Sequence, residues 1–99
     1  MSYRETLSKH ARLAILRFCE GAPKYTTNAS MLSTLLPSVG IELTRDQIVT
    51  ELHWLREQGM LELEETKTGF WIATATVTGV EIAQGVGSHP GIQRPRPGS

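Results

Sequence analysis

The segment TRDQIVTELHWLREQGML, residues 44–61, constrains the fold most strongly, because it contains a helix start, a buried helix face and a helix stop. Thr44 and Gln47 stand three residues apart, which is the spacing of a capping box at a helix N-terminus. Three apolar residues then follow at spacings of four and three and form one buried stripe: Ile48, Leu52 and Leu55. Gly59 suits the left-handed conformation that ends a helix. The sequence therefore predicts an amphipathic helix between Thr44 and Gly59.

Polar side chains occupy the part of this helix that the apolar stripe leaves free. They are Arg45, Gln47, Thr50, His53 and Arg56. Their position indicates a face that is open to a binding partner.

Two more helices are predicted before this one. Apolar residues recur at helical spacing from Tyr3 to Glu20, where Gly21 and Pro23 follow. Residues 24–27 form a short extended link that suits an edge strand beside a later hairpin. Asn28 is a good N-cap for a short helix that Pro37 closes.

A hairpin and a fourth helix are predicted after Gly59. Residues 61–66 and 70–73 alternate in the way of half-buried strands, and Lys67, Thr68 and Gly69 form the loop between them. Residues 76–85 read as a short helix with a capping box of Thr78 and Glu81. The rest, residues 86–99, is rich in proline and glycine and is expected to be an extended or disordered tail beyond a domain of residues 1–85.

This order of elements predicts an α+β, mainly helical fold of the winged helix-turn-helix type, with three helices, a β-hairpin wing and a short C-terminal helix. The 99 residues suit one domain, and 39% hydrophobic with 20% charged residues is typical of a globular protein. No apolar run is long enough for a membrane span, and the polar N-terminus does not resemble a signal peptide. A single cysteine, Cys19, allows no internal disulfide, which fits a reducing cytosol, and we expect a cytoplasmic protein.

The residues also resemble known families. The cap, apolar triad and glycine stop of the Thr44 helix, with the later segment ATVTGVEIAQG, resemble the third helix and the helix after the wing in bacterial winged-helix regulators. The opening YRETL, the segment ARLAILRF and the closing PGIQRPRPG are similar to small winged-helix proteins of Mu-like phages and prophages that are labelled ArsR-type. This resemblance implies a transcriptional regulator. Metal sensing does not carry over, since Cys19 lacks a partner at ligand spacing.

The leading hypothesis is a phage or prophage regulator that binds double-stranded DNA as a homodimer. Arg45 and Gln47 are the candidates for base contacts, Thr50 and His53 lie one turn further along, and two residues are expected to reach phosphates from the helix end and the wing: Arg56 and Lys67. Ten basic residues balance ten acidic ones, and Glu62, Glu64 and Glu65 lie on the wing. A single protomer should therefore bind weakly, and two protomers gain affinity by linkage. The alternative is a winged helix that binds a phage or host protein and no DNA.

No enzymatic activity, cofactor or metal is predicted. His10, His53 and His89 lie far apart in the sequence, and no phosphate loop or nucleophile motif is present. Cys19 reads as a small core residue. Trp54 and Trp71 lie off the main apolar stripes, so they belong either to the core or to a partner surface.

Overall fold

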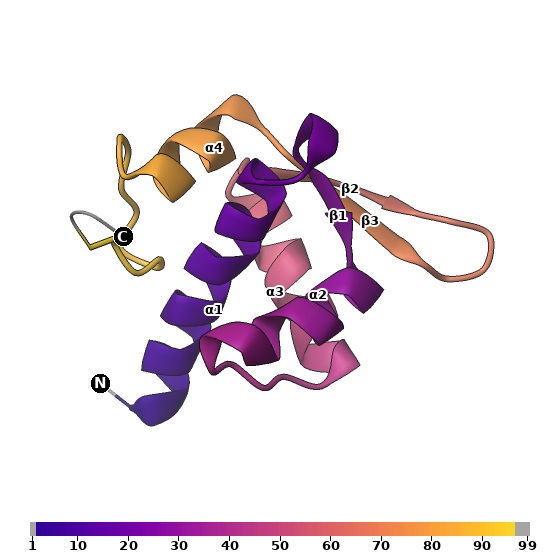
Figure 1. Cartoon of the computed structure of the whole chain (residues 1–99), viewed down its shortest axis with the longest axis horizontal. Coiled ribbons are helices and arrows are strands. Elements are labelled where there is room, and N and C mark those ends of the chain that lie inside the picture. The colour runs from indigo at the N-terminus through magenta and orange to yellow at the C-terminus, as the bar shows by residue number, and fades with distance from the viewer. Residues whose placement is uncertain (1, 97–99) are drawn as a thin grey trace.

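The computed structural model describes residues 2–96, which fold into an α+β, mainly helical domain (Figure 1). Its elements in chain order are α1 (Tyr3–Glu20), the 3₁₀ turn η1 (Pro23–Tyr25), β1 (Thr26–Asn28), α2 (Ala29–Leu35), the 3₁₀ turn η2 (Leu36–Val39), α3 (Arg45–Glu57), β2 (Leu61–Glu65), β3 (Trp71–Ala75) and α4 (Val77–Gln84). The four α-helices and the hairpin that the sequence predicts are therefore all found in the described part of the chain.

The helix boundaries follow from local side-chain chemistry. The Thr44 hydroxyl accepts a hydrogen bond from the Gln47 amide at 3.1 Å, and the Gln47 side chain accepts one from the Thr44 amide at 2.8 Å. This confirms the predicted capping box of α3. Asn28 caps α2 by accepting from the Met31 amide at 2.8 Å. Gly59 has φ 77°, the left-handed conformation expected after α3.

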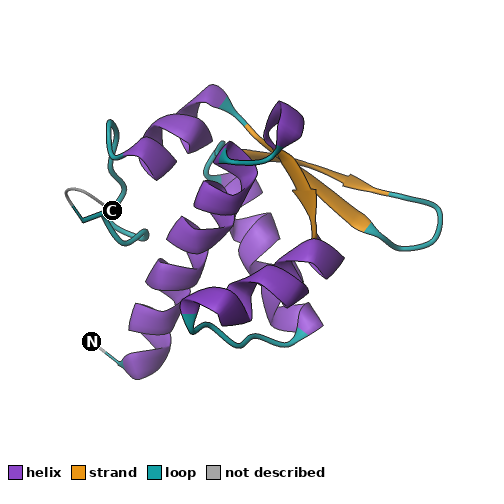
Figure 2. Cartoon of the chain, viewed as in Figure 1, coloured by secondary structure: helices purple, strands orange, loops and turns teal. Residues whose placement is uncertain are grey.

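The sheet has three antiparallel strands in the order β1-β3-β2 (Figure 2). The link before α2 supplies the edge strand from Thr26 onward, where Thr27 in β1 pairs with Ala73 in β3. Lys24 and Tyr25, also expected to be extended, belong instead to η1 and have positive φ. On the other side of β3, Leu63 pairs with Ala73 and Glu64 with Ile72. Gly69 in the β2–β3 loop has φ 78°, as the three-residue connection requires.

The core lies between α1, α2, α3 and the inner face of the sheet. Its largest fully buried side chains are Ile15, Leu16, Leu32, Leu36, Ile48, Leu52, Leu55 and Cys19. Helix α4 packs along α1, where Gly79 approaches the main chain of Met60 closely. These contacts fix α3 and the β2–β3 hairpin relative to α1.

Two further details differ from the sequence predictions. The N-cap of α4 is Thr76 and not Thr78, because β3 ends at Ala75 and the Thr76 hydroxyl accepts from the Gly79 amide at 3.2 Å. The same hydroxyl donates to the Gly59 carbonyl at 2.7 Å, which ties the start of α4 to the end of α3. The sequence also predicts Met31 as one of the apolar residues that the Asn28 helix carries with Leu32, Leu35 and Leu36, but 51% of the Met31 surface is exposed.

Candidate nucleic-acid interface

Helix α3 is docked through one side and open on the other. Ile48, Leu52 and Leu55 are fully buried, as the stripe predicts, and they pack with α2, β2 and α1. Glu51 lies on the same side and is 8% exposed. Figure 1 shows α3 behind α1 and α2, so its remaining surface points away from both helices.

The open side of α3 has three parts, which follow from the helical repeat. The wing flank consists of Arg45, Val49 and Arg56, next to His53, whose ring contacts Trp71 in β3. The outer face consists of Asp46, Thr50, His53 and Glu57. The opposite flank consists of Gln47, Trp54 and Gln58. The five polar residues singled out in the sequence are therefore spread over three surfaces of the helix.

Several of these side chains already have partners within the chain. Gln47 is held in the capping box, and the Thr50 hydroxyl donates to the Asp46 carbonyl at 2.9 Å. His53 Nδ1 lies 2.8 Å from the Val49 carbonyl oxygen, and its ring meets Trp71 edge to face at 4.6 Å. Arg45 and Arg56 are exposed, and neither forms an ion pair with another of residues 2–96. They are the two cations of α3 that remain open to a ligand.

The acidic residues of the wing are divided between the two faces of the hairpin. Glu62 and Glu64 pair with Thr74 and Ile72, on the sheet face that points away from the core. Glu65 pairs with Trp71, on the face that continues from the core toward α3. Lys67 is exposed in the loop between the strands. Two of the three wing carboxylates therefore point away from α3.

Trp54 is half-buried beneath the C-terminal segment, defined as residues 86–96. The guanidinium carbon of Arg12 lies 3.8 Å from the centre of a Trp54 ring, and His89 meets the same tryptophan edge to face at 5.3 Å. Arg12 Nε also lies 2.7 Å from Glu51 Oε1. Trp54 is thus covered by residues of its own chain.

The C-terminal segment has no helix or strand, but it is anchored on the domain. Ile92 is 4% exposed and belongs to the core. The Gly91 carbonyl accepts from Arg12 Nη1 at 3.0 Å, and the Gln93 amide donates to the Lys9 carbonyl at 3.2 Å. Sequence reasoning missed these contacts, although Ile92 was an apolar residue in an otherwise polar stretch. Residues 97–99 of the predicted tail lie outside the described part of the chain.

The remaining chemistry of the described residues is sparse. Burial raises the pKa of the Cys19 thiol to about 12, so the thiol stays protonated. In residues 2–96, no three His, Cys, Asp or Glu side chains are grouped to hold a metal ion. None of the helices in that range is long and apolar enough to cross a bilayer.

Comparison with known proteins gives the family. The chain is 32% identical over 93 residues to the uncharacterized protein gp26 of Escherichia phage Mu, and the alignment covers 94% of this chain and 95% of the phage protein. The chain belongs to the phage Mu gp26 family. It is also 37% identical over 76 residues to an uncharacterized protein of Haemophilus influenzae, an alignment that covers 77% of this chain and 74% of that protein.

The gp26 relationship confirms the association with Mu-like phages that the resemblance implies. No protein-family model and no solved structure matches the chain. Because both relatives are uncharacterized, the ArsR-type and winged-helix parts of the resemblance stay predictions.

Proposed function

We propose that this gp26-family protein is a winged helix-turn-helix regulator that binds double-stranded DNA in the cytoplasm of the bacterial host. In this assignment α2 and α3 form the helix-turn-helix, and the β2–β3 hairpin is the wing. The observation that carries the proposal is the wing flank of α3. There Arg45 and Arg56 are exposed on the flank of α3 that lies next to the hairpin, and the loop of that hairpin carries Lys67.

The spacing of the two arginines suits a helix placed in the major groove. They are eleven positions apart in the numbering, which corresponds to about 16 Å along a helix axis. The major groove is about 12 Å wide, so side chains at the two ends of α3 can reach the backbones on both sides of it. Arg45, at the helix N-terminus, is also the cation placed to approach a guanine edge.

The other candidate residues take lesser roles in this proposal. Thr50 and His53 lie on the outer face, five and eight residues after Arg45, and can contact bases only where the helix lies deep in the groove. Gln47 reads adenine only after its side chain leaves the capping box, which would expose the Thr44 amide. Lys67 contacts a phosphate from the wing.

Acidic residues limit the affinity of one protomer. Asp46 and Glu57 lie on the outer face beside the two arginines, so the four charges of α3's open side cancel. Three basic contacts, each with a counterion slope of about 0.9, lose about fortyfold in affinity between about 50 and 200 mM salt. A homodimer offsets this weakness by linking two sites.

The test is a fluorescence-anisotropy titration with mixed-sequence duplex DNA at low and physiological salt. Arg45→Ala and Arg56→Ala should weaken binding and each lower the salt slope by about one. Asp46→Asn should strengthen binding by removing a charge that repels phosphate. Arg94→Ala, an exposed arginine of the C-terminal segment, is the matched control. Binding that Arg45→Ala leaves unchanged would refute the proposed interface.

The second candidate function is a winged-helix module that binds a phage or host protein and no DNA. The net charge of zero on the open side of α3 supports it, because that surface as a whole mixes acidic, basic and aromatic groups and lacks the excess of positive charge usual for nucleic-acid interfaces. Absence of DNA binding at low salt, with the domain folded, would favour this function.

A further inference from the structure

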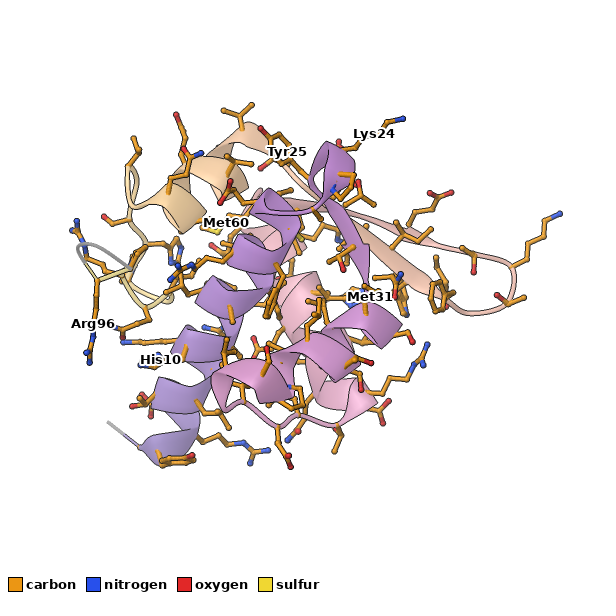
Figure 3. The ribbon with its side chains drawn as sticks, in the orientation of Figure 1. His10, Lys24, Tyr25, Met31, Met60 and Arg96 are labelled. Carbon is orange, nitrogen blue, oxygen red and sulfur yellow. The ribbon has the colours of Figure 1, made fainter. Side chains whose placement is uncertain are left out.

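The C-terminal segment, residues 86–96, is held on the domain by few contacts for its length. Ile92 is the one side chain of the segment that is buried in the core. The exposed residues of the segment are Val86, Ser88, Pro90, Arg94 and Arg96. Figure 3 shows Arg96 at the outer edge of the molecule. A segment with one apolar anchor depends on its polar contacts, so the loss of one of these contacts can release it without unfolding the domain.

His89 makes two of these polar contacts, one with each ring nitrogen. The Gly91 amide donates to His89 Nδ1 at 2.9 Å, so Nδ1 is the acceptor nitrogen and carries no proton. The ring proton is therefore on Nε2, which lies 3.1 Å from Gln58 Oε1 and donates to it. Together the two hydrogen bonds require the neutral form of the His89 ring.

The charged groups next to His89 include three cations. Arg12 of α1 stacks on Trp54, the same side chain that the His89 ring contacts, and it also donates to the Gly91 carbonyl. Lys9 of α1 and Arg94 of the C-terminal segment line one hollow of about 470 Å³ together with His89. In residues 2–96, neither α4 nor the sheet supplies a residue to the lining of this hollow.

Two carboxylates of α3 lie near Trp54, and both are placed away from His89. Glu51 is already paired with Arg12, at 2.7 Å. Glu57 shares a hollow with Trp54 on the outer face of α3, and His89 does not line that hollow. Gln58, the α3 residue that contacts His89, has no charge. A positive charge on His89 would therefore be placed among cations.

We propose that the C-terminal segment is a pH-sensitive strap, which the neutral form of His89 fastens over Trp54 and which protonation of His89 releases. A proton on Nδ1 would point at the Gly91 N–H, and because both groups are then donors their hydrogen bond is lost. The charged ring would also stand on the same tryptophan as the Arg12 guanidinium. Histidine changes its charge between about pH 5 and 8, so the strap is fastened at neutral pH and loosened in mild acid.

The backbone on both sides of His89 suits such a movement. Gly91 lies directly on the indole, since a Cβ at this position would be 2.7 Å from two ring carbons of Trp54. At the other end, the Val86 and Gly87 amides both donate to the Glu81 carbonyl and complete the cap of α4. Residues 88–96 can therefore leave the domain while α4 keeps its cap.

Release of the strap would uncover Trp54 on the open side of α3. Trp54 lines the hollow of about 330 Å³ on the outer face, together with Val49, Thr50, His53 and Glu57. The released form would therefore present a larger apolar surface beside this hollow. The wing flank is a different surface of α3, so the strap and the proposed DNA contact can fail independently of each other.

The first test is hydrogen exchange of the full chain at pH 7.5 and pH 5.5, followed by NMR without DNA. Protection factors remove the intrinsic effect of pH on exchange. The Gln93 amide, which donates to the Lys9 carbonyl, should lose protection at least tenfold at pH 5.5. The Met60 amide, which donates to the Leu55 carbonyl in the core, should keep its protection. Equal protection of Gln93 at the two pH values overturns the proposal.

The second test replaces the histidine. His89→Gln should abolish the pH dependence of Gln93 protection, because glutamine does not titrate. His53→Gln is the matched control, since His53 is also half-buried but contacts Trp71 on the wing side, and this variant should keep the pH dependence. Loss of Gln93 protection at pH 5.5 that persists in His89→Gln would refute His89 as the switch and assign the effect to another group, such as the Arg12–Glu51 pair.

The third test releases the strap without a change of pH. Gly91→Ala places a methyl group against Trp54, so at pH 7.5 it should lower Gln93 protection at least tenfold and shift the indole N–H resonance of Trp54. Gly87→Ala is the matched control, because a Cβ there would lie 3.7 Å from its nearest atom. Gly91→Ala with the Trp54 resonance and the Gln93 protection of the wild type would show that the segment is not fastened on this ring, and would refute the proposal.

Discussion

Replacement of Arg12 should show how much of the fold depends on one side chain. Arg12 binds the Glu51 carboxylate at 2.7 Å, donates to the Gly91 carbonyl at 3.0 Å and stacks on Trp54. It therefore joins α1 to α3 and both to the C-terminal segment. Arg12→Met keeps much of the stem volume and removes all three polar contacts.

The expected cost follows from the carboxylate that is left behind. The side chains of Arg12 and Glu51 are only 17% and 11% exposed, so Glu51 would lose its counterion in a poorly solvated site. Removing one partner of a buried ion pair costs about 3–5 kcal/mol, and the remaining access to water favours the lower end, about 3 kcal/mol. For a domain of this size that loss lowers Tm by about 12–24 °C.

The assay is thermal and urea unfolding followed by circular dichroism, with hydrogen exchange as a local probe. The double variant Arg12→Met/Glu51→Leu should be more stable than Arg12→Met alone, because it buries no unpaired charge. The Gln93 amide, which bonds to the Lys9 carbonyl, should lose protection in both variants. Arg4→Ala, a control at an exposed arginine of α1, should change stability by less than about 0.5 kcal/mol. A loss under about 1 kcal/mol for Arg12→Met, or costs that simply add in the double variant, would refute the reasoning.

Three other outcomes follow from single positions. The Cys19 thiol should resist alkylation in the folded protein, and rapid labelling at pH 8 would contradict its burial. The thiol ionises near its ordinary pKa of 9.0 in the unfolded chain and at a pKa of about 12 in the folded chain, so the free energy of unfolding should fall as pH rises from 9 to 12. Gly79→Ala should cost about 3 kcal/mol by urea unfolding, because a Cβ there would lie 2.2 Å from the Met60 carbonyl oxygen, whereas Gly87→Ala, with 3.7 Å to its nearest atom, should be close to neutral. Lys24 has φ 55° without being glycine, so Lys24→Gly should stabilise the protein by about 0.5 kcal/mol, and a lower Tm would show that the left-handed turn is not strained.

The elements of this fold were predictable where a local signal determines them. The Thr44–Gln47 capping box and the stop at Gly59 define α3, because both act within a few residues of the chain. The edge strand β1 was foreseeable in part, since the link between α1 and the Asn28 cap is extended from Thr26 onward, whereas its first residues form η1. The misplaced cap of α4 shows the limit: two threonines compete for the role, and Thr76 has it because its hydroxyl also reaches the Gly59 carbonyl.

Contacts between distant segments were not predictable in this way. The C-terminal segment was expected to be extended or disordered because its composition offers only two large apolar residues, Val86 and Ile92, and Val86 is exposed. Its anchoring depends on Arg12, Trp54 and Lys9, which are 35 or more positions away in the numbering from Gly91, His89 and Gln93, the residues that they contact. The composition of a segment indicates how much apolar surface it can bury, but it does not show whether other elements of the fold form a binding surface for that segment. For the same reason, the sequence did not show which flank of α3 lies next to which neighbour. The His53–Trp71 contact shows the side next to the hairpin, and the Trp54–His89 contact shows the side next to the C-terminal segment.

The arrangement of charges on α3 determines how the helix can meet DNA. Arg45 and Arg56 are each followed in sequence by an acid, and one step along a helix turns the side chain by about 100°. The cations therefore lie on the wing flank, and Asp46 and Glu57 lie on the outer face. Phosphates attract the arginines of the wing flank and repel the carboxylates of the outer face. Helix α3 would therefore have to contact a duplex through its wing flank, with the hairpin lying over the DNA backbone. A net charge of zero is compatible with DNA binding only because the two signs are separated in this way.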